Sequence, residues 1–152
     1  MVHPDAIHRF TLWAALADNL LVENMDKRKP VGRTARELTQ IFCDLPEAGM
    51  CFDIAHARQF DTSMTEAYKI LRDHGDRIRQ VHISEVNTSS KHDRMSPTAV
   101  RAYQDVSGLI PPDAPIILET PAEGDQIEEQ LDLAAAAFNA SRVRRRKMGR
   151  VS

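Results

Sequence analysis

The sequence lacks long apolar runs and has few cysteines, and each absence excludes a class of protein. No stretch approaches the roughly 18 uninterrupted apolar residues of a membrane span. The opening segment MVHPDAIHRF has neither the basic start nor the apolar run of a secretory signal peptide. The two cysteines, Cys43 and Cys51, are too few for a disulfide framework, and we expect reduced, buried thiols. These features predict a cytoplasmic protein without a membrane partner.

Positive charge is scarce outside the C-terminal segment. Six of the 20 basic residues lie from Arg142 onward in a stretch without acids, which leaves 14 basic residues against 22 acidic ones in the rest. An acidic body argues against nucleic-acid binding, because that needs Lys and Arg to neutralise phosphates. With 42% hydrophobic and 28% charged residues, the composition is that of a globular domain. We expect one domain over residues 1–140, followed by a basic, disordered tail over residues 141–152.

Four short apolar runs, each closed by a polar group, predict buried strands. They are Asn19–Asn24, Gly49–Ile54, Gln80–Ser84 and Pro115–Thr120. Continuous apolar runs of this length are typical of parallel strands that are covered on both faces.

Helix signals separate these strands. Capping boxes at Thr34–Glu37 and Ser63–Glu66 each predict a helix start, and Ser96 followed by proline predicts a third. Asp125 with Glu128 opens a last helix, and an early helix is expected over Ala6–Leu16. Because strands and helices alternate, the pattern favours a parallel sheet with helical crossovers.

The segment Val2–Asp5 resembles the end of a further strand. At most two residues precede His3, whereas a strand normally has about five or six residues. We therefore expect strands upstream of this chain to be missing.

The four strand ends present Glu23, Asp53, His82 and Glu119. In parallel α/β folds, the carboxyl ends of strands meet at one edge, where ligands bind. Three carboxylates and an imidazole brought together there repel one another and lose hydration unless a cation lies between them. Taken singly, each has an ordinary interpretation: a loop acid, a helix cap or a core histidine. Together they predict one divalent metal ion, with Mn²⁺, Mg²⁺ or Co²⁺ favoured and Zn²⁺ compatible.

The strings LLVENMD, CFDIAHA, VHISEVN and PIILETP resemble the xylose-isomerase-like TIM-barrel superfamily. This superfamily contains sugar and sugar-phosphate isomerases and epimerases, and the apurinic endonucleases of the endonuclease IV type. The resemblance runs from His3 to about Phe138 and covers the later part of a barrel, from the end of the third strand onward. It implies a (β/α)8 TIM-barrel fold that is incomplete here, with about the last five βα units.

The resemblance also implies roles. The positions matching Glu23, Asp53, His82 and Glu119 bind one divalent metal in ketose epimerases, and those matching Glu23 and Glu119 are the catalytic acid and base. The position matching His56, in Asp-x-x-His, contacts substrate oxygens.

The sequence departs from the endonuclease pattern after the sixth strand of the barrel. Those enzymes carry an Asp-x-His pair there, whereas Ser90–Met95 reads SKHDRM. We expect His92 and Arg94 to contact substrate instead. His3 matches a metal-site histidine of the endonucleases and is a candidate for additional metal or substrate binding, although an exposed terminal residue is an equal alternative.

Three hypotheses follow. The first is a metal-dependent isomerase or epimerase of a small carbohydrate-like substrate, and the second is an apurinic-endonuclease-type phosphodiesterase. The third is a non-catalytic, truncated remnant or subunit of the same fold. The seventh barrel strand is expected to be short, between His92 and Ser96. An open half-barrel exposes strand edges, so we expect a homo-oligomer or pairing with the missing N-terminal segment.

Overall fold

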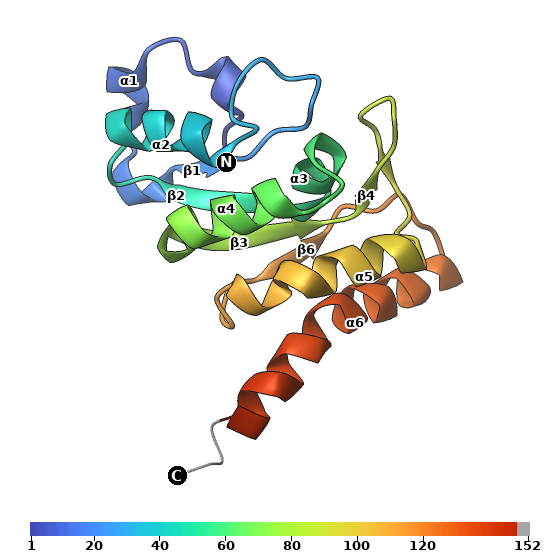
Figure 1. Cartoon of the computed structure of the whole chain (residues 1–152). Coiled ribbons are helices and arrows are strands. Elements are labelled where there is room, and N and C mark those ends of the chain that lie inside the picture. The colour runs from blue at the N-terminus through green and yellow to red at the C-terminus, as the bar shows by residue number, and fades with distance from the viewer. Residues whose placement is uncertain (149–152) are drawn as a thin grey trace.

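Four short apolar segments form one parallel sheet (Figure 1). The computed structural model describes residues 1–148, and side chains as far as residue 138. The strands are β1 (Leu21–Glu23), β2 (Gly49–Asp53), β3 (Ile78–Ile83) and β6 (Ile116–Leu118). Their order is β1-β2-β3-β6 and each neighbouring pair is parallel. The mixed α/β fold and the positions of the four predicted strands are thus confirmed.

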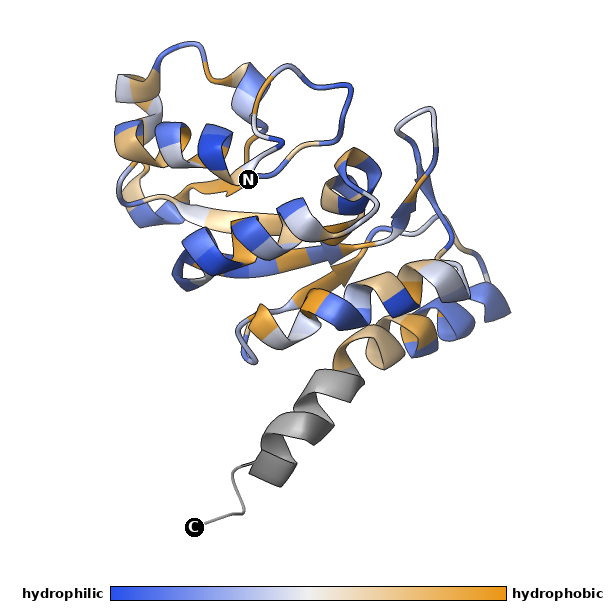
Figure 2. Cartoon of the chain, in the orientation of Figure 1, coloured by the Kyte–Doolittle hydropathy of each residue, from blue (hydrophilic) through white to orange (hydrophobic). Residues whose placement is uncertain are grey.

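Helices follow the strands and pack on the sheet. The α-helices are α1 (Phe10–Ala14), α2 (Ala35–Asp44), α3 (Ile54–Phe60), α4 (Thr65–His74), α5 (Pro97–Val106) and α6 (Asp125–Met148), and the short 3-10 helices are η1 (Pro4–Ala6), η2 (Ala17–Asn19), η3 (Gly75–Arg77) and η4 (Ser107–Leu109). Helix α2 packs beside α4, α4 beside α5, and α5 beside α6. Figure 2 shows both hydrophobic and hydrophilic residues on these helices, as expected for helices with one face on a core.

The two faces of the sheet have different roles. Side chains alternate along a strand, so Phe52 and Val81, which are register partners, point to one face and belong to the hydrophobic core. The next pair, Asp53 and His82, points to the other face and is also buried. This alternation separates the apolar core from the polar groups at the ends of the strands.

Two of the predicted helix caps are confirmed. The Thr34 hydroxyl accepts a hydrogen bond from the Glu37 N–H at 3.1 Å, and the Ser96 hydroxyl accepts one from the Ala99 N–H at 3.2 Å. Both satisfy a backbone donor that the first turn of a helix leaves unpaired.

The capping box expected at Ser63 is wrong. Helix α4 follows Met64, which has a left-handed φ of 61°, and Asp61 supplies the cap by accepting from the Glu66 N–H at 2.9 Å. The Glu66 carboxylate is also engaged elsewhere, since it accepts from the Ala35 N–H at 2.8 Å. The Glu66 carboxylate therefore does not reach back to the Ser63 N–H, as a capping box requires.

The N-terminal region differs in extent from its prediction. The expected helix over Ala6–Leu16 is reduced to the five residues of α1 between two 3-10 helices. Val2 forms an isolated parallel bridge with Val22 of β1, which agrees with its interpretation as the end of a strand.

The expected seventh strand between His92 and Ser96 is absent from the sheet. Strand β6 pairs directly with β3, through Ile83 and Leu118 among others. His92 instead belongs to β5 (His92–Asp93), which forms an antiparallel pair with β4 (Glu85–Val86). The chain reverses after β4 through a turn and returns before α5, so these residues form a hairpin rather than a crossover.

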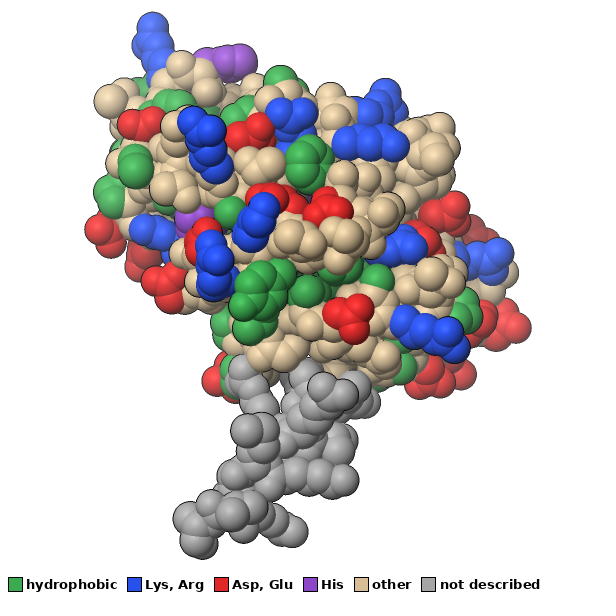
Figure 3. All heavy atoms as spheres, in the orientation of Figure 1, with side chains coloured by type: hydrophobic (Ala, Val, Ile, Leu, Met, Phe, Trp, Pro, Cys, Tyr) green, Lys and Arg blue, Asp and Glu red, His purple; other side chains and the backbone are tan. Residues whose placement is uncertain are grey.

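Figure 3 shows acidic and basic side chains interspersed on the face drawn there. Among the residues that the structure describes, no helix has the length and apolar character of a membrane span. Helix α6 continues past the expected domain boundary at residue 140 to Met148, and the predicted disorder beyond that point lies outside the described residues.

Candidate metal centre

The four predicted ligands converge at the carboxyl ends of the strands. One ligand atom from each of Glu23, Asp53, His82 and Glu119 lies within 4.8 Å of those of the other three. Glu23 and Asp53 end β1 and β2, His82 precedes the last residue of β3, and Glu119 follows β6 directly. The Glu119 N–H donates to the Ile83 carbonyl at 3.0 Å, which extends the sheet by one residue and fixes this carboxylate beside His82.

His82 lies between two carboxylates. Its Nδ1 is 3.0 Å from Oε1 of Glu23 and 3.0 Å from Oε1 of Glu119. Its Nε2 is 2.5 Å from Nε2 of Gln80. Carboxylates only accept hydrogen bonds, so His82 carries a proton on Nδ1, which faces both of them.

The charges in this cluster shift one another's titration. Burial raises the pKa of Glu23, but the hydrogen bond from His82 and the nearby imidazoles of His56, His82 and His3 outweigh it, so this pKa lies below its ordinary value. For His82, burial lowers the pKa, whereas the bond to Glu23 and the charge of Glu119 raise it by more. The net result is a His82 that holds its proton more tightly than an exposed histidine.

Asp53 has one satisfied and one unsatisfied oxygen. Its Oδ1 accepts from the His56 N–H at 2.8 Å and so caps α3, a helix that the sequence did not predict. Its Oδ2 is buried and forms no hydrogen bond with the described residues, while His56 Nδ1 lies 3.5 Å away. Burial raises the pKa of Asp53, because a carboxylate there loses its hydration. An unpaired buried oxygen next to other ligand atoms fits a cation better than a neutral neighbour.

Asn24 holds Asp53 in position. Its side-chain Nδ2 donates to the Asp53 carbonyl and its Oδ1 accepts from the Asp53 N–H, both at 2.8 Å. This reciprocal pair joins the ends of β1 and β2. Two other polar residues after β1 have partners away from Glu23: Asp26 accepts from the Ser90 hydroxyl, and Lys29 pairs with Asp5 at 2.7 Å.

Three further histidines surround the cluster. His3 Nε2 is 3.0 Å from Oε2 of Glu23, so this predicted candidate does reach the site although its side chain is 45% exposed. His56 Nδ1 lies 3.0 Å from the Asn24 carbonyl. His92 Nε2 is 3.6 Å from Oε2 of Glu119, and Asp53, His56 and His92 form a second group of potential ligands.

Arg94 is not brought into this cluster. It is exposed, and the structure records its backbone N–H donating to the Asp93 carboxylate at 2.8 Å. Its predicted contact with substrate thus has no support from neighbouring site residues.

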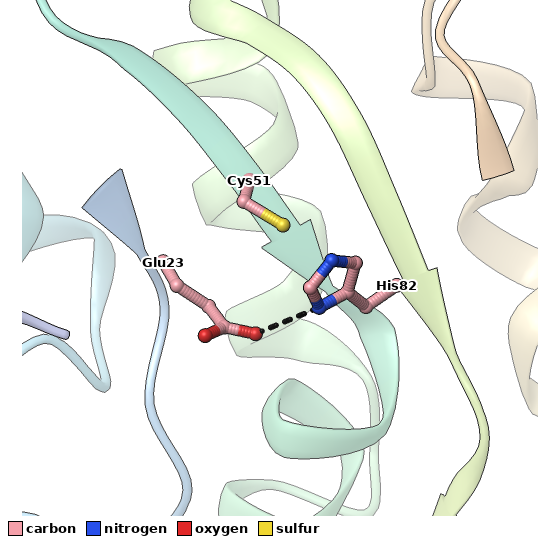
Figure 4. A group of neighbouring side chains, drawn as sticks. All are labelled: Glu23, Cys51 and His82. Atoms are coloured by element: carbon pink, nitrogen blue, oxygen red, sulfur yellow. Dashed lines mark hydrogen bonds and ion pairs between the residues drawn. The ribbon is translucent and has the colours of Figure 1, made fainter. Parts of the chain in front are cut away.

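Cys51 and Gln80 are site residues that the sequence reasoning missed. Cys51 is fully buried and forms a third potential ligand group with Glu23 and His82. Figure 4 shows its sulfur pointing toward the His82 ring. Burial raises the pKa of the Cys51 thiol well above its ordinary value. The available signal was strand alternation, because Cys51 stands two residues before Asp53 and Gln80 two before His82. Cys43, expected to be buried, is exposed.

No protein-family model matches this chain, and a comparison with curated proteins also gives no match.

Proposed function

We propose that this chain is a metal-dependent isomerase or epimerase of small sugar-like polyols, built as the later part of a (β/α)8 barrel of the xylose-isomerase-like type. The observation that carries the proposal is the convergence of Glu23, Asp53, His82 and Glu119 at the ends of four parallel strands. Ligand binding at this end of the sheet is the rule for parallel α/β folds.

The donor set supports a divalent cation. Glu23, Asp53 and Glu119 supply carboxylate oxygens and His82 supplies a ring nitrogen, a set that suits Mn²⁺, Mg²⁺ or Co²⁺. Among these ligand atoms, Oδ2 of Asp53 is the one that is buried without a hydrogen bond from the described residues. Such an ion, when bound, supplies Lewis-acid polarisation of the substrate's carbonyl and hydroxyl oxygens.

Glu23 and Glu119 are suited to move protons. Each lies 3.0 Å from His82 Nδ1, and they come from strands on opposite sides of β2 and β3. One carboxylate removes the proton from the carbon next to the carbonyl, and the other delivers a proton to the opposite face. The Glu119 side chain is 30% exposed and the Glu23 side chain is 2% exposed, so Glu119 is the carboxylate more open to an incoming substrate. His56, buried beside Asp53, and the more exposed His92 orient substrate hydroxyl groups.

Proton exchange measures this chemistry directly. The chain is incubated with Mn²⁺ and a panel of ketoses in D₂O, and deuterium at the carbon next to the carbonyl is followed by NMR. We expect Glu119→Gln to slow exchange at least about 100-fold, the lower end of what a general base contributes. Glu123→Gln, an exposed glutamate in the same loop, is the matched control and should leave exchange unchanged.

Two results would overturn the proposal. One is a failure of Mn²⁺ to bind, measured by calorimetry and by electron paramagnetic resonance. The other is exchange that proceeds equally in Glu119→Gln.

A second candidate function, a metal-dependent phosphodiesterase acting on abasic DNA, is favoured by one observation. His3 contacts Glu23, and Asp53, His56 and His92 form a further ligand group, so the cluster offers ligands for more than one ion. Nicking of an abasic duplex with Zn²⁺, without exchange on ketoses, would support it. Metal binding without either activity identifies a non-catalytic member of the same fold.

A further inference from the structure

Cys51 occupies a position one step deeper in the sheet than the four converging ligands. It lies on β2 two residues before Asp53, so both side chains point to the same face. Register places Cys51 beside Glu23 on one side and beside Gln80 on the other. Its side chain is fully buried.

Cys51 and two neighbouring side chains bring potential ligand atoms close together. One ligand atom each from Glu23, Cys51 and His82 lies within 4.8 Å of the other two. In Figure 4 the three side chains point toward one another from neighbouring strands. Sulfur with imidazole and one carboxylate is a set that selects Zn²⁺ or Co²⁺, whereas Mg²⁺ and Mn²⁺ prefer oxygen. Three protein ligands leave a fourth position open for water or substrate.

Gln80 is placed to support a thiolate. Its Nε2 lies 3.8 Å from Cys51 Sγ and 2.5 Å from His82 Nε2. The same amide therefore lies against two of the three ligands and restricts rotation of the imidazole. Hydrogen bonds of this kind to ligating atoms orient them and tune the metal.

We propose that this chain has a second, deeper metal position formed by Glu23, Cys51 and His82, which takes a thiophilic ion such as Zn²⁺ or Co²⁺. The inference rests on the proposed function in one respect, because Glu23 and His82 also belong to the oxygen-rich position. Sharing these ligands makes the two positions mutually exclusive. On binding, the S–H bond is replaced by a sulfur–metal bond and His82 gives up the proton on the nitrogen that would ligate the ion; both protons are released to solvent, with no change in oxidation state.

Cobalt absorption tests the proposal, because a thiolate bound to Co²⁺ gives a near-ultraviolet charge-transfer band that oxygen and nitrogen ligands do not. The full chain is titrated with Co²⁺ as wild type, Cys51→Ser, Cys43→Ser and Asp53→Asn. Cys43 is the matched control, since it is the exposed cysteine. We expect the band in wild type, in Cys43→Ser and in Asp53→Asn, and its loss in Cys51→Ser.

A parallel measurement separates this proposal from the proposed function. Cys51→Ser should bind Mn²⁺ as wild type does, within about twofold, and should bind Zn²⁺ more than about tenfold more weakly, since even outer partners of a ligand contribute that much. Absence of the band in wild type, or its persistence in Cys51→Ser, overturns the deeper position even if Mn²⁺ binds. Loss of the band in Asp53→Asn also overturns it, because the deeper position does not include that carboxylate.

Discussion

The Oδ2 atom of Asp53 is buried without a hydrogen bond from the described residues, so its environment is suited to a ligand and unfavourable without one. An asparagine at position 53 keeps the side-chain oxygen that caps α3 but removes the negative charge. In EDTA, we expect Asp53→Asn to raise the free energy of unfolding by about 1 kcal/mol, within the range for relieving an unsatisfied buried group. The variant should also lose the stabilisation that Mn²⁺ gives wild type. Urea denaturation with and without Mn²⁺ measures both effects.

Asp44→Asn, at an exposed position on α2, is the control and should change stability by less than about 0.5 kcal/mol. A clear loss of stability in Asp53→Asn, or a retained response to Mn²⁺, contradicts the prediction.

His82 gives the metal-free chain a pH dependence with a definite sign. Its pKa is raised because the carboxylates of Glu23 and Glu119 outweigh burial. A raised pKa contributes stability that is fully present below the ordinary value of about 6.5 and is lost as pH rises through the folded-state value. We therefore expect the free energy of unfolding in EDTA to fall as the pH rises from about 6.5 through the folded-state pKa of His82. With Mn²⁺ the trend should reverse, because protons compete with the metal for Nδ1.

His82→Gln should flatten the pH dependence in both conditions. Denaturation at a series of pH values measures this, and an unchanged slope in the variant would assign the effect to another group.

At the scale of elements, the start of α4 gives a test of the corrected cap. Asp61 accepts hydrogen bonds from the backbone N–H groups of both Ser63 and Glu66. We expect Asp61→Ala to lower the free energy of unfolding by about 1 kcal/mol, the usual cost of losing a cap. Ser63→Ala should cost less than about 0.5 kcal/mol, because Ser63 is exposed and its hydroxyl accepts only a long, 3.3 Å hydrogen bond from the Thr65 N–H. Equal effects of the two variants would restore the capping box that the sequence suggested.

Elements whose signals are local were predicted well. The strand ends at Glu23 and Asp53 followed from apolar runs, and their convergence followed from parallel strands sharing one edge. The caps at Thr34 and Ser96 needed only their own turn of helix.

Elements that depend on distant contacts were missed. The Glu66 carboxylate accepts a hydrogen bond from the Ala35 N–H of another helix, and the sequence around Glu66 does not indicate this partner. Helix α3 has only seven residues and is capped by a residue already assigned to the site. Strand alternation places Cys51 on the same face as Asp53, but its position beside Glu23 and Gln80 required the register of β2 with both neighbours.

At the scale of the whole molecule, the sheet has an uncovered edge. Among residues 1–148, no strand pairs with the side of β6 that faces away from β3. Ile117 on β6 is 42% exposed and Leu131 on α6 is 51% exposed, and an apolar groove between β6 and α6 includes Leu131. Exposed strand edges with apolar neighbours promote pairing with another chain. We expect the protein to self-associate, with a sedimentation coefficient that rises with concentration.

Ile117→Lys should shift this association toward monomer. Leu12→Lys, on α1 and 64% exposed, is the matched control and should sediment as wild type does. A single monomeric species at every concentration would contradict the prediction.

The four converging ligands come from four strands that are far apart along the chain, and this has a kinetic consequence. No local segment can assemble the ion's coordination shell, so the shell exists only when all four strands are in register. The ion therefore stabilises the native state more than any partly ordered species on the folding pathway. Bound metal should therefore lower the unfolding rate and leave the refolding rate nearly unchanged.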